Sequence, residues 1–205
     1  MVTRLERVVK RVLDLLIASV ALLVLLIPFV VVAALVKFDS KGPVFFRHTR
    51  VGAHGRSFRM WKFRTMVNDA EARLRELSAV GNVYADGPFV KIDHDPRITR
   101  LGAFLRKTSV DELPQLLNVV TGEMSLVGPR PLVAAEVEAL GDSAEERQRV
   151  LPGITGLWQV SGRSSTTSDE RLELDLEYVR RRGLSFDLRI LLLTVPAVLW
   201  RRGAM

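Results

Sequence analysis

Two adjacent carboxylates, Asp111 and Glu112, lie in the part of the sequence with the densest set of chemically active side chains. Ser109 precedes Glu112 by three residues, which is the spacing of a capping box, and Leu113 begins a run of apolar residues at helical intervals. The pattern predicts that both acids lie in the first turn of a helix, where free N–H groups and the helix dipole favour anions. Acidic residues at such a place are also ordinary helix caps, so the pair alone does not establish a reactive site.

Cations surround this pair along the chain. Arg106 and Lys107 come before it, and the sequence GPRP at residues 128–131 follows the predicted helix. Two prolines stiffen that loop, and the guanidinium of Arg130 matches phosphate oxygens in a bidentate manner. Phosphoryl transfer needs a nucleophile and positive charge around the transferring group, so the combination is typical of a phosphoryl-transfer site. A GPRP sequence by itself can also be a tight turn that binds no anion.

The composition limits the partners and reactions of the chain. Its 205 residues contain 30 Lys and Arg against 23 Asp and Glu, which gives a formal charge of +7. This excess favours anionic partners, which include phosphate-rich substrates, nucleic acid and acidic lipid surfaces. Because the chain has no Cys, disulfides, thiolate metal sites and cysteine nucleophiles are excluded.

An uncharged apolar run extends over residues 15–36, and as a helix of roughly 33 Å it is long enough to cross a bilayer core of about 30 Å. Pro28 in its second half removes a backbone hydrogen bond and predicts a kink in the membrane helix. Positive charge marks the cytoplasmic side of a membrane, and both flanks carry it. A helix that enters, bends at Pro28 and returns to the same face satisfies both flanks, while a kinked span remains an open alternative. The flanking residues are Arg4, Arg7, Lys10 and Arg11 before the run and Lys37, Lys41, Arg47 and Arg50 after it.

The rest of the chain predicts a mixed α/β fold in which helices dominate. Residues 44–51 and 57–65 are expected to form a small β-hairpin around the turn GAHGR. An apolar stretch over residues 188–200 predicts an amphipathic interfacial helix with Trp200 at the headgroup level, and an ordinary core helix is the alternative. The chain therefore divides into a basic flank with its membrane helix, residues 1–41, and a domain that holds the candidate site, residues 42–205.

Three further helices are expected between the hairpin and the C-terminal stretch. Asn68 and Glu71 form a possible capping pair for a helix that reaches Leu77. Ser168 or Asp169 would cap the last helix of this part of the chain. The helix between them carries an apolar stripe of Ile98, Leu101, Phe104 and Leu105.

Four blocks of the chain, in order, resemble those of the bacterial sugar transferase family, which comprises small monotopic polyprenyl-phosphate phosphoglycosyl transferases. The likeness covers nearly the whole chain. One block can arise by chance, whereas four in the same order are highly specific. The blocks are GPVFFRHTRVG at 42–52, FRMWKFRTM at 58–66, DPRITRLGAFLRKTSVDELPQLLNVVTGEMSLVGPRPL at 95–132 and LPGITGLWQVSGRS at 151–164.

The resemblance implies roles for individual residues. Asp111 corresponds to the family's catalytic nucleophile and Glu112 to its acidic partner, while Lys62, Arg106 and Arg130 correspond to basic residues around the substrate phosphates. It also implies a requirement for Mg²⁺, for which Asp111 and Glu112 are reasonable oxygen ligands. The sequence leaves open whether Glu112 is a metal ligand or an orienting base.

The reaction implied by the resemblance transfers a sugar 1-phosphate from a nucleotide diphosphate sugar, expected to be a UDP-hexose, to polyprenyl (undecaprenyl) phosphate. A covalent aspartyl-phosphosugar intermediate is expected on the way. The site would lie on the cytoplasmic face of the bacterial inner membrane, held there by a re-entrant kinked helix, and would start exopolysaccharide, capsule, O-antigen or glycoconjugate assembly. A homodimer is compatible with this interpretation, and nucleic acid is not an expected partner.

A different class of protein is the alternative. A membrane-tethered basic protein that binds nucleic acid or acidic lipid would explain the charge and the apolar run. It offers no reason for the carboxylates beside the rigid GPRP loop, and the sequence contains no recognised nucleic-acid motif.

Overall fold

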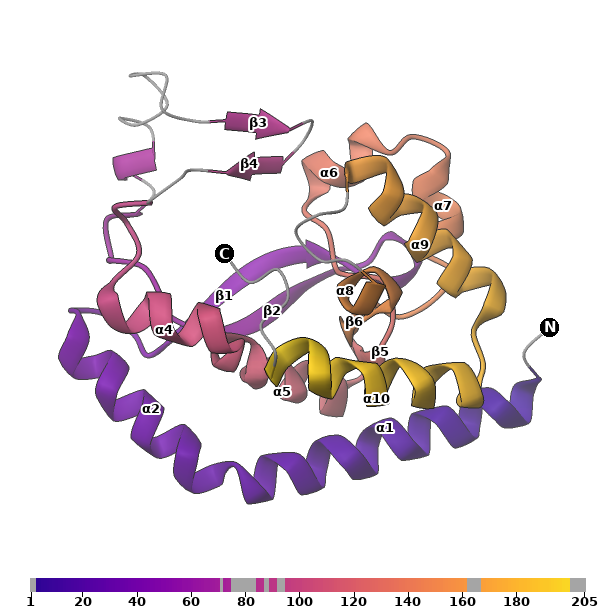
Figure 1. Ribbon diagram of the computed structural model, residues 1–205, viewed down its shortest axis with the longest axis horizontal. Coiled ribbons are helices and arrows are strands. Elements are labelled where there is room, and N and C mark those ends of the chain that lie inside the picture. Colours follow the sequence, from indigo (N-terminus) through magenta and orange to yellow (C-terminus); the bar gives the residue numbers. More distant parts are fainter. Residues whose placement is uncertain are drawn as a thin grey trace.

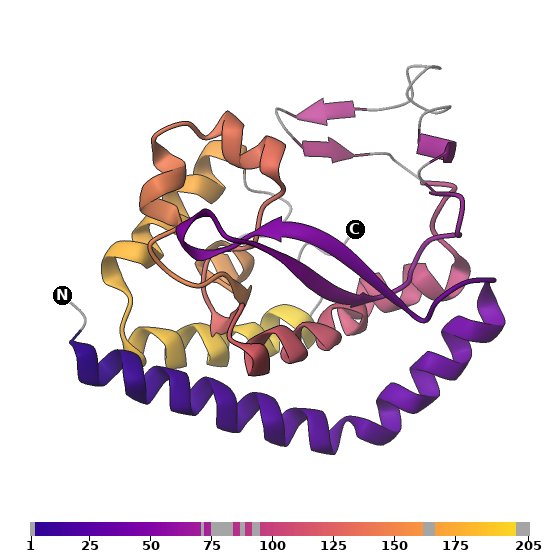
Figure 2. The ribbon, with the colours of Figure 1, turned by 180° about the vertical axis from the view of Figure 1, so that it is seen from behind.

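The computed structural model describes residues 3–70, 72–74, 84–86, 89–91, 95–161 and 167–199. Within these residues helices dominate, and the strands form three small two-stranded sheets. The predicted helix-rich mixed α/β class is therefore confirmed. Figure 1 and Figure 2 show a long bent pair of helices along one side of the molecule, with the other described elements packed over its concave side.

The elements are named in chain order. The strands are β1 (Phe45–Val51), β2 (Ser57–Phe63), β3 (Tyr84–Asp86), β4 (Phe89–Lys91), β5 (Ser125–Val127) and β6 (Gly153–Thr155). The helices are α1 (Arg4–Val24), α2 (Leu26–Asp39), α4 (Arg100–Thr108), α5 (Leu116–Thr121), α6 (Ala134–Ala139), α7 (Ser143–Arg147), α8 (Leu157–Ser161), α9 (Ser168–Arg181) and α10 (Leu184–Leu199), with the 3₁₀ turns η1 (Ala53–Gly55) and η2 (Val110–Gln115).

Helix α1 begins at a capping box and is amphipathic. The Glu6 N–H donates to Thr3 Oγ1 at 3.1 Å, and the Thr3 N–H donates to the Glu6 carboxylate at 2.8 Å. The inner face buries Asp14 and Ala18 against the rest of the chain, whereas on the outer face Leu23 is 74 % exposed. The helix therefore turns an apolar surface away from the domain that it packs against.

The chain bends by 62° between α1 and α2. The break lies at Leu25, one turn before Pro28. Proline has no N–H to bond the carbonyl of Val24, and its ring crowds that carbonyl, so a break here follows from the chemistry of proline. Among the residues that the structure describes, neither helix by itself is long and apolar enough to cross a bilayer, although the bent pair taken together meets that test of length and composition.

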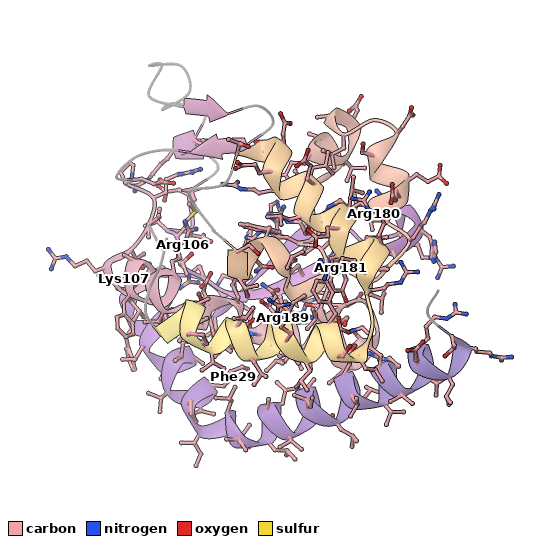
Figure 3. The ribbon with its side chains drawn as sticks, turned by 45° about the vertical axis from the view of Figure 1, so that its right-hand side comes forward. Phe29, Arg106, Lys107, Arg180, Arg181 and Arg189 are labelled. Carbon is pink, nitrogen blue, oxygen red and sulfur yellow. The ribbon has the colours of Figure 1, made fainter. Side chains whose placement is uncertain are left out.

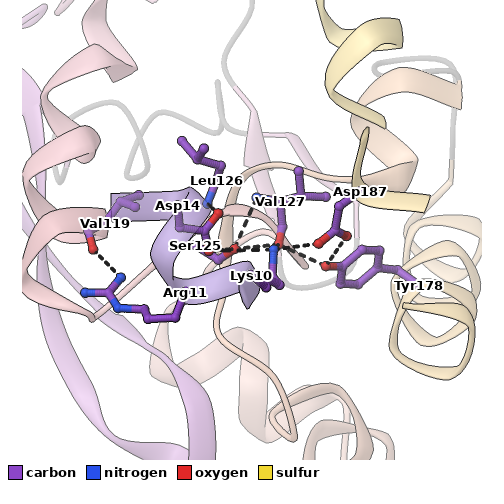
Figure 4. A network of polar contacts seen from close by, with 9 residues as sticks. All are labelled: Lys10, Arg11, Asp14, Val119, Ser125, Leu126, Val127, Tyr178 and Asp187. Atoms are coloured by element: carbon purple, nitrogen blue, oxygen red, sulfur yellow. Dashed lines mark hydrogen bonds and ion pairs between the residues drawn. The ribbon is translucent and has the colours of Figure 1, made fainter. Parts of the chain in front are cut away.

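Polar side chains of α1 bind groups in the domain above it (Figure 4). The Asp14 carboxylate accepts a hydrogen bond from Ser125 Oγ of β5 at 2.8 Å. Lys10 Nζ lies 2.6 Å from one oxygen of Asp187 in α10, and the hydroxyl of Tyr178 donates to the other oxygen at 2.8 Å. Because Asp14, Tyr178 and Asp187 are buried, these contacts hold α1 in one position on the domain.

The predicted β-hairpin is confirmed. β1 and β2 pair antiparallel along their whole length. Phe58 and Met60 of β2 are buried in the main core, so Lys62 follows them on the same face of the strand. Phe63 faces the other way and packs in a second cluster with Val36 of α2. The end of β2 therefore lies between the core and the bent helix pair.

The predicted helices differ from the observed ones in detail. In α4 the buried positions are Gly102 and Leu105, and Phe104, which the apolar stripe predicts as buried, is 57 % exposed. The difference arises because the backbone of α4 packs closely through Gly102, which turns Phe104 outward. Helix α9 is capped by Thr167 rather than by Ser168 or Asp169, since the Thr167 hydroxyl accepts from the Glu170 N–H at 3.3 Å.

The C-terminal helix α10 begins at Leu184, four residues before the predicted apolar stretch. It leaves Leu188 and Leu192 exposed and buries Ile190 completely, as the amphipathic pattern predicts. Three residues of the expected elements, Glu71, Leu77 and Trp200, lie outside the described part of the chain.

The contact between Asp14 of α1 and Ser125 of β5 is expected to stabilise the fold. Replacing Asp14 by Ala leaves the buried Leu126 N–H, which lies 3.3 Å from the carboxylate, without that acceptor. The Ser125 hydroxyl loses its bond to Asp14 and keeps only the Val127 carbonyl, at 3.0 Å. We expect a loss of roughly 1–3 kcal/mol in the free energy of unfolding, because unsatisfied buried donors cost about that much. The measurement is the thermal midpoint of the detergent-purified chain, compared with Ser19→Ala on the exposed side of α1. Equal midpoints for the two variants would contradict the contact.

Candidate active site

The two acids lie in η2, a 3₁₀ turn, and not at the start of an α-helix as predicted. Ser109 ends α4 in the left-handed region, with a φ of 58°, and its side chain caps no N–H of the turn. The Glu112 N–H bonds the Ser109 carbonyl at 3.2 Å instead. Pro114 has no N–H for the carbonyl of Val110, which favours the tighter turn over an α-helix. The predicted capping box is wrong, and the Glu112 side chain is available for other partners.

Glu112 is held by two of the predicted cations. Lys62 Nζ lies 2.6 Å from Glu112 Oε1, and Arg130 Nη2 lies 3.4 Å from the same oxygen. Burial by itself would raise the pKa of Glu112, but Lys62 and Arg130 outweigh burial and hold the pKa at about 2. Glu112 is therefore ionised and neutralised by its partners at every physiological pH.

Asp111 is buried as well, at 6 % exposure, but unlike Glu112 its carboxylate is not paired with a cation. Within the part of the chain that the structure describes, no hydrogen bond or ion pair holds its carboxylate. Burial raises the pKa of Asp111 to about 6, in spite of the opposing charge of Lys62. A carboxylate that is removed from water and free of partners is suited to act as a nucleophile.

Arg106 is positioned by the segment after β2. Its Nε donates to Thr65 Oγ1 at 2.9 Å. Helix α4 approaches this segment so closely that a Cβ at Gly102 would lie 2.0 Å from the Thr65 carbonyl oxygen, which only glycine permits. The charge of Arg106 opposes the rise in the pKa of Asp111, whereas the neighbouring Lys107 extends away from the molecule (Figure 3).

The loop that carries Arg130 is fixed by its backbone. The Gly128 N–H donates to the Thr155 carbonyl at 2.9 Å, and the Gly153 N–H donates to the Pro129 carbonyl at 2.9 Å. A Cβ at Gly153 would lie 2.1 Å from the Gly128 nitrogen, so the two segments meet only because both are glycine there. These bonds bring the GPRP loop and the LPG sequence of the last block together.

A buried ion pair adds to this support. Arg147 of α7 lies 2.7 Å from the Asp175 carboxylate of α9, and the side chains are 6 % and 5 % exposed. The same guanidinium donates to the carbonyl of Arg130. Sequence reasoning missed this pair because its members lie on different helices and no local pattern links them.

Asn118 is a second residue that sequence reasoning missed, and it fixes η2 and α5 to β2. It is completely buried, its Oδ1 accepts from the Trp61 N–H at 3.0 Å, and its Nδ2 donates to the Arg59 carbonyl at 2.9 Å. The amide therefore satisfies both a donor and an acceptor on the edge of β2 that β1 leaves open. The one sequence feature that could have indicated this buried contact is the single Asn within the apolar run LLNVV.

The structure therefore brings four of the predicted residues, Asp111, Glu112, Lys62 and Arg130, into one cluster, with Arg106 within electrostatic range. Among the described residues no group of three or more potential metal ligands forms. Mg²⁺ usually takes one or two carboxylates and completes its shell with water and substrate phosphates, so the free Asp111 carboxylate and the second oxygen of Glu112 fit it. Arg163, in the SGRS sequence, lies outside the described residues.

The sequence is similar to known proteins over nearly its whole length. The family profile described as Bacterial sugar transferase matches residues 5–201. The chain is 46 % identical over 197 residues to the exopolysaccharide production protein ExoY of Rhizobium meliloti, covering 95 % of this chain and 87 % of that protein. The chain belongs to the bacterial sugar transferase family. The predicted resemblance is thereby confirmed.

Two longer relatives carry more specific names. This bacterial sugar transferase is 42 % identical over 204 residues to the undecaprenyl-phosphate galactose phosphotransferase of Salmonella typhimurium, covering 98 % of this chain and 42 % of the relative. It is 40 % identical over 199 residues to the UDP-glucose:undecaprenyl-phosphate glucose-1-phosphate transferase of Escherichia coli, covering 93 % of this chain and 40 % of the relative. The chain thus spans less than half the length of these two proteins.

The raised pKa of Asp111 predicts that the stability of the fold depends on pH. Its ordinary value is 3.8 and its value in the folded protein is about 6, so ionisation destabilises the fold as the pH rises between these values. The amide in the Asp111→Asn variant stays neutral, and we expect this variant to be more stable than the parent chain by on the order of 3 kcal/mol at pH 7.5. At pH 4 the difference should be small. The measurement is the thermal midpoint in detergent with EDTA at both pH values, and a pH-independent difference would contradict the assignment.

Proposed function

We propose that this bacterial sugar transferase moves a sugar 1-phosphate from a UDP-hexose to polyprenyl (undecaprenyl) phosphate. The observation that carries the proposal is a buried, unengaged carboxylate, Asp111, beside a second one, Glu112, that Lys62 and Arg130 neutralise. The names of the relatives support the same substrates, since they describe galactose and glucose 1-phosphate transfer to undecaprenyl phosphate. ExoY, by its name, serves exopolysaccharide production, which supports a role at the start of such a pathway.

In the first step an Asp111 oxygen attacks the phosphorus that carries the sugar. The bond from this phosphorus to the oxygen of the nucleoside phosphate breaks, and UMP leaves with the electron pair. The sugar 1-phosphate is then joined to Asp111 as an acyl phosphate. Lys62, Arg106 and Arg130 offset the negative charge that gathers around the phosphorus.

In the second step an oxygen of the polyprenyl phosphate attacks the same phosphorus. The bond to Asp111 breaks, the carboxylate is restored, and the product is a polyprenyl diphosphate sugar. One carboxylate thus serves a soluble donor and a membrane-bound acceptor in turn, so the two substrates need not be bound at the same time.

Mg²⁺ is part of the proposal. Asp111 and Glu112 would hold it, and when bound it would neutralise phosphate charge during transfer. Two neighbouring carboxylates support this part of the proposal, because carboxylate oxygens are ligands that Mg²⁺ prefers. Phosphate oxygens of the substrate commonly complete the shell of such an ion.

The bent helix pair supports a re-entrant position in the bacterial inner membrane. Asp14 of α1 and Val36 of α2 both contact the same domain, through Ser125 and Phe63 respectively. A spanning helix would carry residues 22 positions apart to opposite sides of the membrane. Contact of both residues with the same domain instead supports a chain that returns to one side. With basic residues beyond both ends, that side is the cytoplasm.

The alternative of a tethered basic binding protein has less support. It accounts for the charge and the exposed apolar face of α1, but it gives no role to the separation in pKa between Asp111 and Glu112. Family membership also favours the enzyme. The absence of nucleic acid among its partners, and a homodimeric state, stay predictions.

UMP release tests the reaction. With Mg²⁺, undecaprenyl phosphate and UDP-galactose or UDP-glucose, the detergent-purified chain should release UMP, and Asp111→Asn should not. Lys62→Met should slow release by about 10²–10³-fold, because it removes a cation from the transferring phosphate. Lys107→Met, which removes a neighbouring charge that points into solvent, is the matched control.

The covalent step is tested in the same preparation. Without the lipid acceptor, UDP-sugar labelled with ³²P on the phosphate next to the sugar should label the parent chain and not Asp111→Asn. UMP release by Asp111→Asn at the parent rate would overturn the role of this residue. Binding of nucleic acid without any UMP release would instead favour the tethered binder.

Cysteine labelling tests the re-entrant helix, because the chain has no Cys of its own. We expect Arg4→Cys and Lys41→Cys, at the two ends of the helix pair, to react with a membrane-impermeant maleimide in inverted vesicles and not in intact spheroplasts. Ala103→Cys in α4 marks the side of the catalytic domain. Labelling of only one of the two ends from each side would show a spanning helix.

A further inference from the structure

A cavity of about 560 Å³ lies at the N-terminal end of α1. Its walls come from α1, the turn of the β1–β2 hairpin, the end of α5 and the connection between α9 and α10. None of the five candidate site residues lines it. Phe58 lines the cavity, and Lys62 follows four residues along β2, which is about 13 Å of strand. The cavity is therefore separate from the site around Asp111.

The lining of this cavity is strongly basic. It contains twice as many cations as carboxylates, and the carboxylates are Glu6, Glu123 and Asp187. The six cations are Arg7, Lys10, Arg11, Arg56, Arg149 and Arg182.

Each of the three carboxylates already has partners. Asp187 binds Lys10 at 2.6 Å, and Glu6 completes the cap at Thr3. Glu123 Oε2 accepts from Asn118 Nδ2 at 2.7 Å. The acids thus serve local structure, and most of the arginines are left without a carboxylate partner.

The five arginines differ in their partners. Arg149 lies 3.9 Å from Glu145, and Arg182 Nη1 donates to the Val179 carbonyl at 2.5 Å. Arg11 is held in place by the last carbonyls of α5, with Nη1 2.6 Å from the Val119 oxygen and Nη2 3.1 Å from the Val120 oxygen. These neutral acceptors orient its charge without cancelling it. For Arg7 and Arg56, no described residue forms a hydrogen bond or ion pair with the side chain. A preorganised guanidinium beside unpaired ones is what a phosphate group requires.

The surroundings of the cavity indicate the source of that phosphate. On the first turns of α1, Leu5 is 72 % exposed, Val8 54 % and Val9 36 %, so an apolar surface adjoins Arg7. Part of the cavity wall is apolar as well, through Phe58, Val150 and Leu184. A ligand with a phosphate and acyl chains fits both features.

We propose that this cavity is a second phosphate site, distinct from the site at Asp111, that binds the headgroup of an acidic phospholipid. The phosphate chemistry stands on the cavity and its cations, and the choice of a lipid as its source rests on the membrane insertion proposed above. The site would hold the N-terminal end of α1 at the headgroup layer.

The test uses the full chain in detergent, without nucleotide sugar, so that its failure is independent of the transferase reaction. Binding of dioctanoyl phosphatidylglycerol, dioctanoyl phosphatidylcholine and inorganic phosphate is followed by native mass spectrometry and by the thermal midpoint. Arg7→Gln/Arg56→Gln removes two charges from the cavity, and Lys41→Gln/Arg100→Gln removes two exposed charges elsewhere. Circular dichroism checks that both variants are folded.

We expect phosphatidylglycerol to bind and to raise the midpoint, with phosphatidylcholine much weaker. The cavity variant should bind phosphatidylglycerol on the order of 30-fold more weakly, and the control variant should match the parent chain. Binding of inorganic phosphate in competition with the lipid would support the phosphate site and show that acyl chains are not required. Equal phosphatidylglycerol binding by the two variants, or no binding by the parent chain, would overturn the proposal.

Discussion

The amide of Asn118 on the open edge of β2 is the contact on which the candidate site depends. β1 covers one edge of the strand, and the amide bonds the Trp61 N–H and the Arg59 carbonyl on the other. Because it uses a donor and an acceptor together, it allows only one register of η2 and α5 along the strand. A slip by one residue would turn Lys62 to the opposite face and away from Glu112. A neutral, fully buried contact thus decides which charges meet.

Once this register is set, one ammonium group gives two neighbouring carboxylates different properties. Lys62 binds Glu112 directly and, with Arg130, holds its pKa at about 2, whereas it only partly offsets the burial that raises the pKa of Asp111 to about 6. Environments that separate the pKa values of paired acids also separate their chemical roles. The arrangement assigns the structural anion to Glu112 and leaves Asp111 as the group able to react.

Four consecutive residues couple this site to the bent helix pair. Lys62 belongs to the site, and Phe63 packs in the cluster beneath α2. Arg64 is buried and donates to the Val36 and Ser40 carbonyls at the end of α2, at 3.1 and 2.5 Å. Thr65 accepts from Arg106. Any shift of α2 relative to the domain would therefore reach the cations around Asp111 through a short, hydrogen-bonded stretch of backbone.

The sequence by itself determined the local features: the hairpin around its turn, the amphipathic helices, the proline that breaks the apolar run, and the types of residue that gather at the site. Hydrophobic periodicity, turn residues and motifs depend on residues that are close together in the sequence. The elements that they specify could therefore be predicted. The 3₁₀ turn in place of the expected capping box follows from Pro114, a local effect that the sequence-based prediction did not weigh fully. Only the tertiary structure decided that Lys62 meets Glu112 fifty residues away, and that Asn118 and Arg147 support the site. These contacts join distant segments, and their partners are selected by packing and burial, which no local pattern encodes.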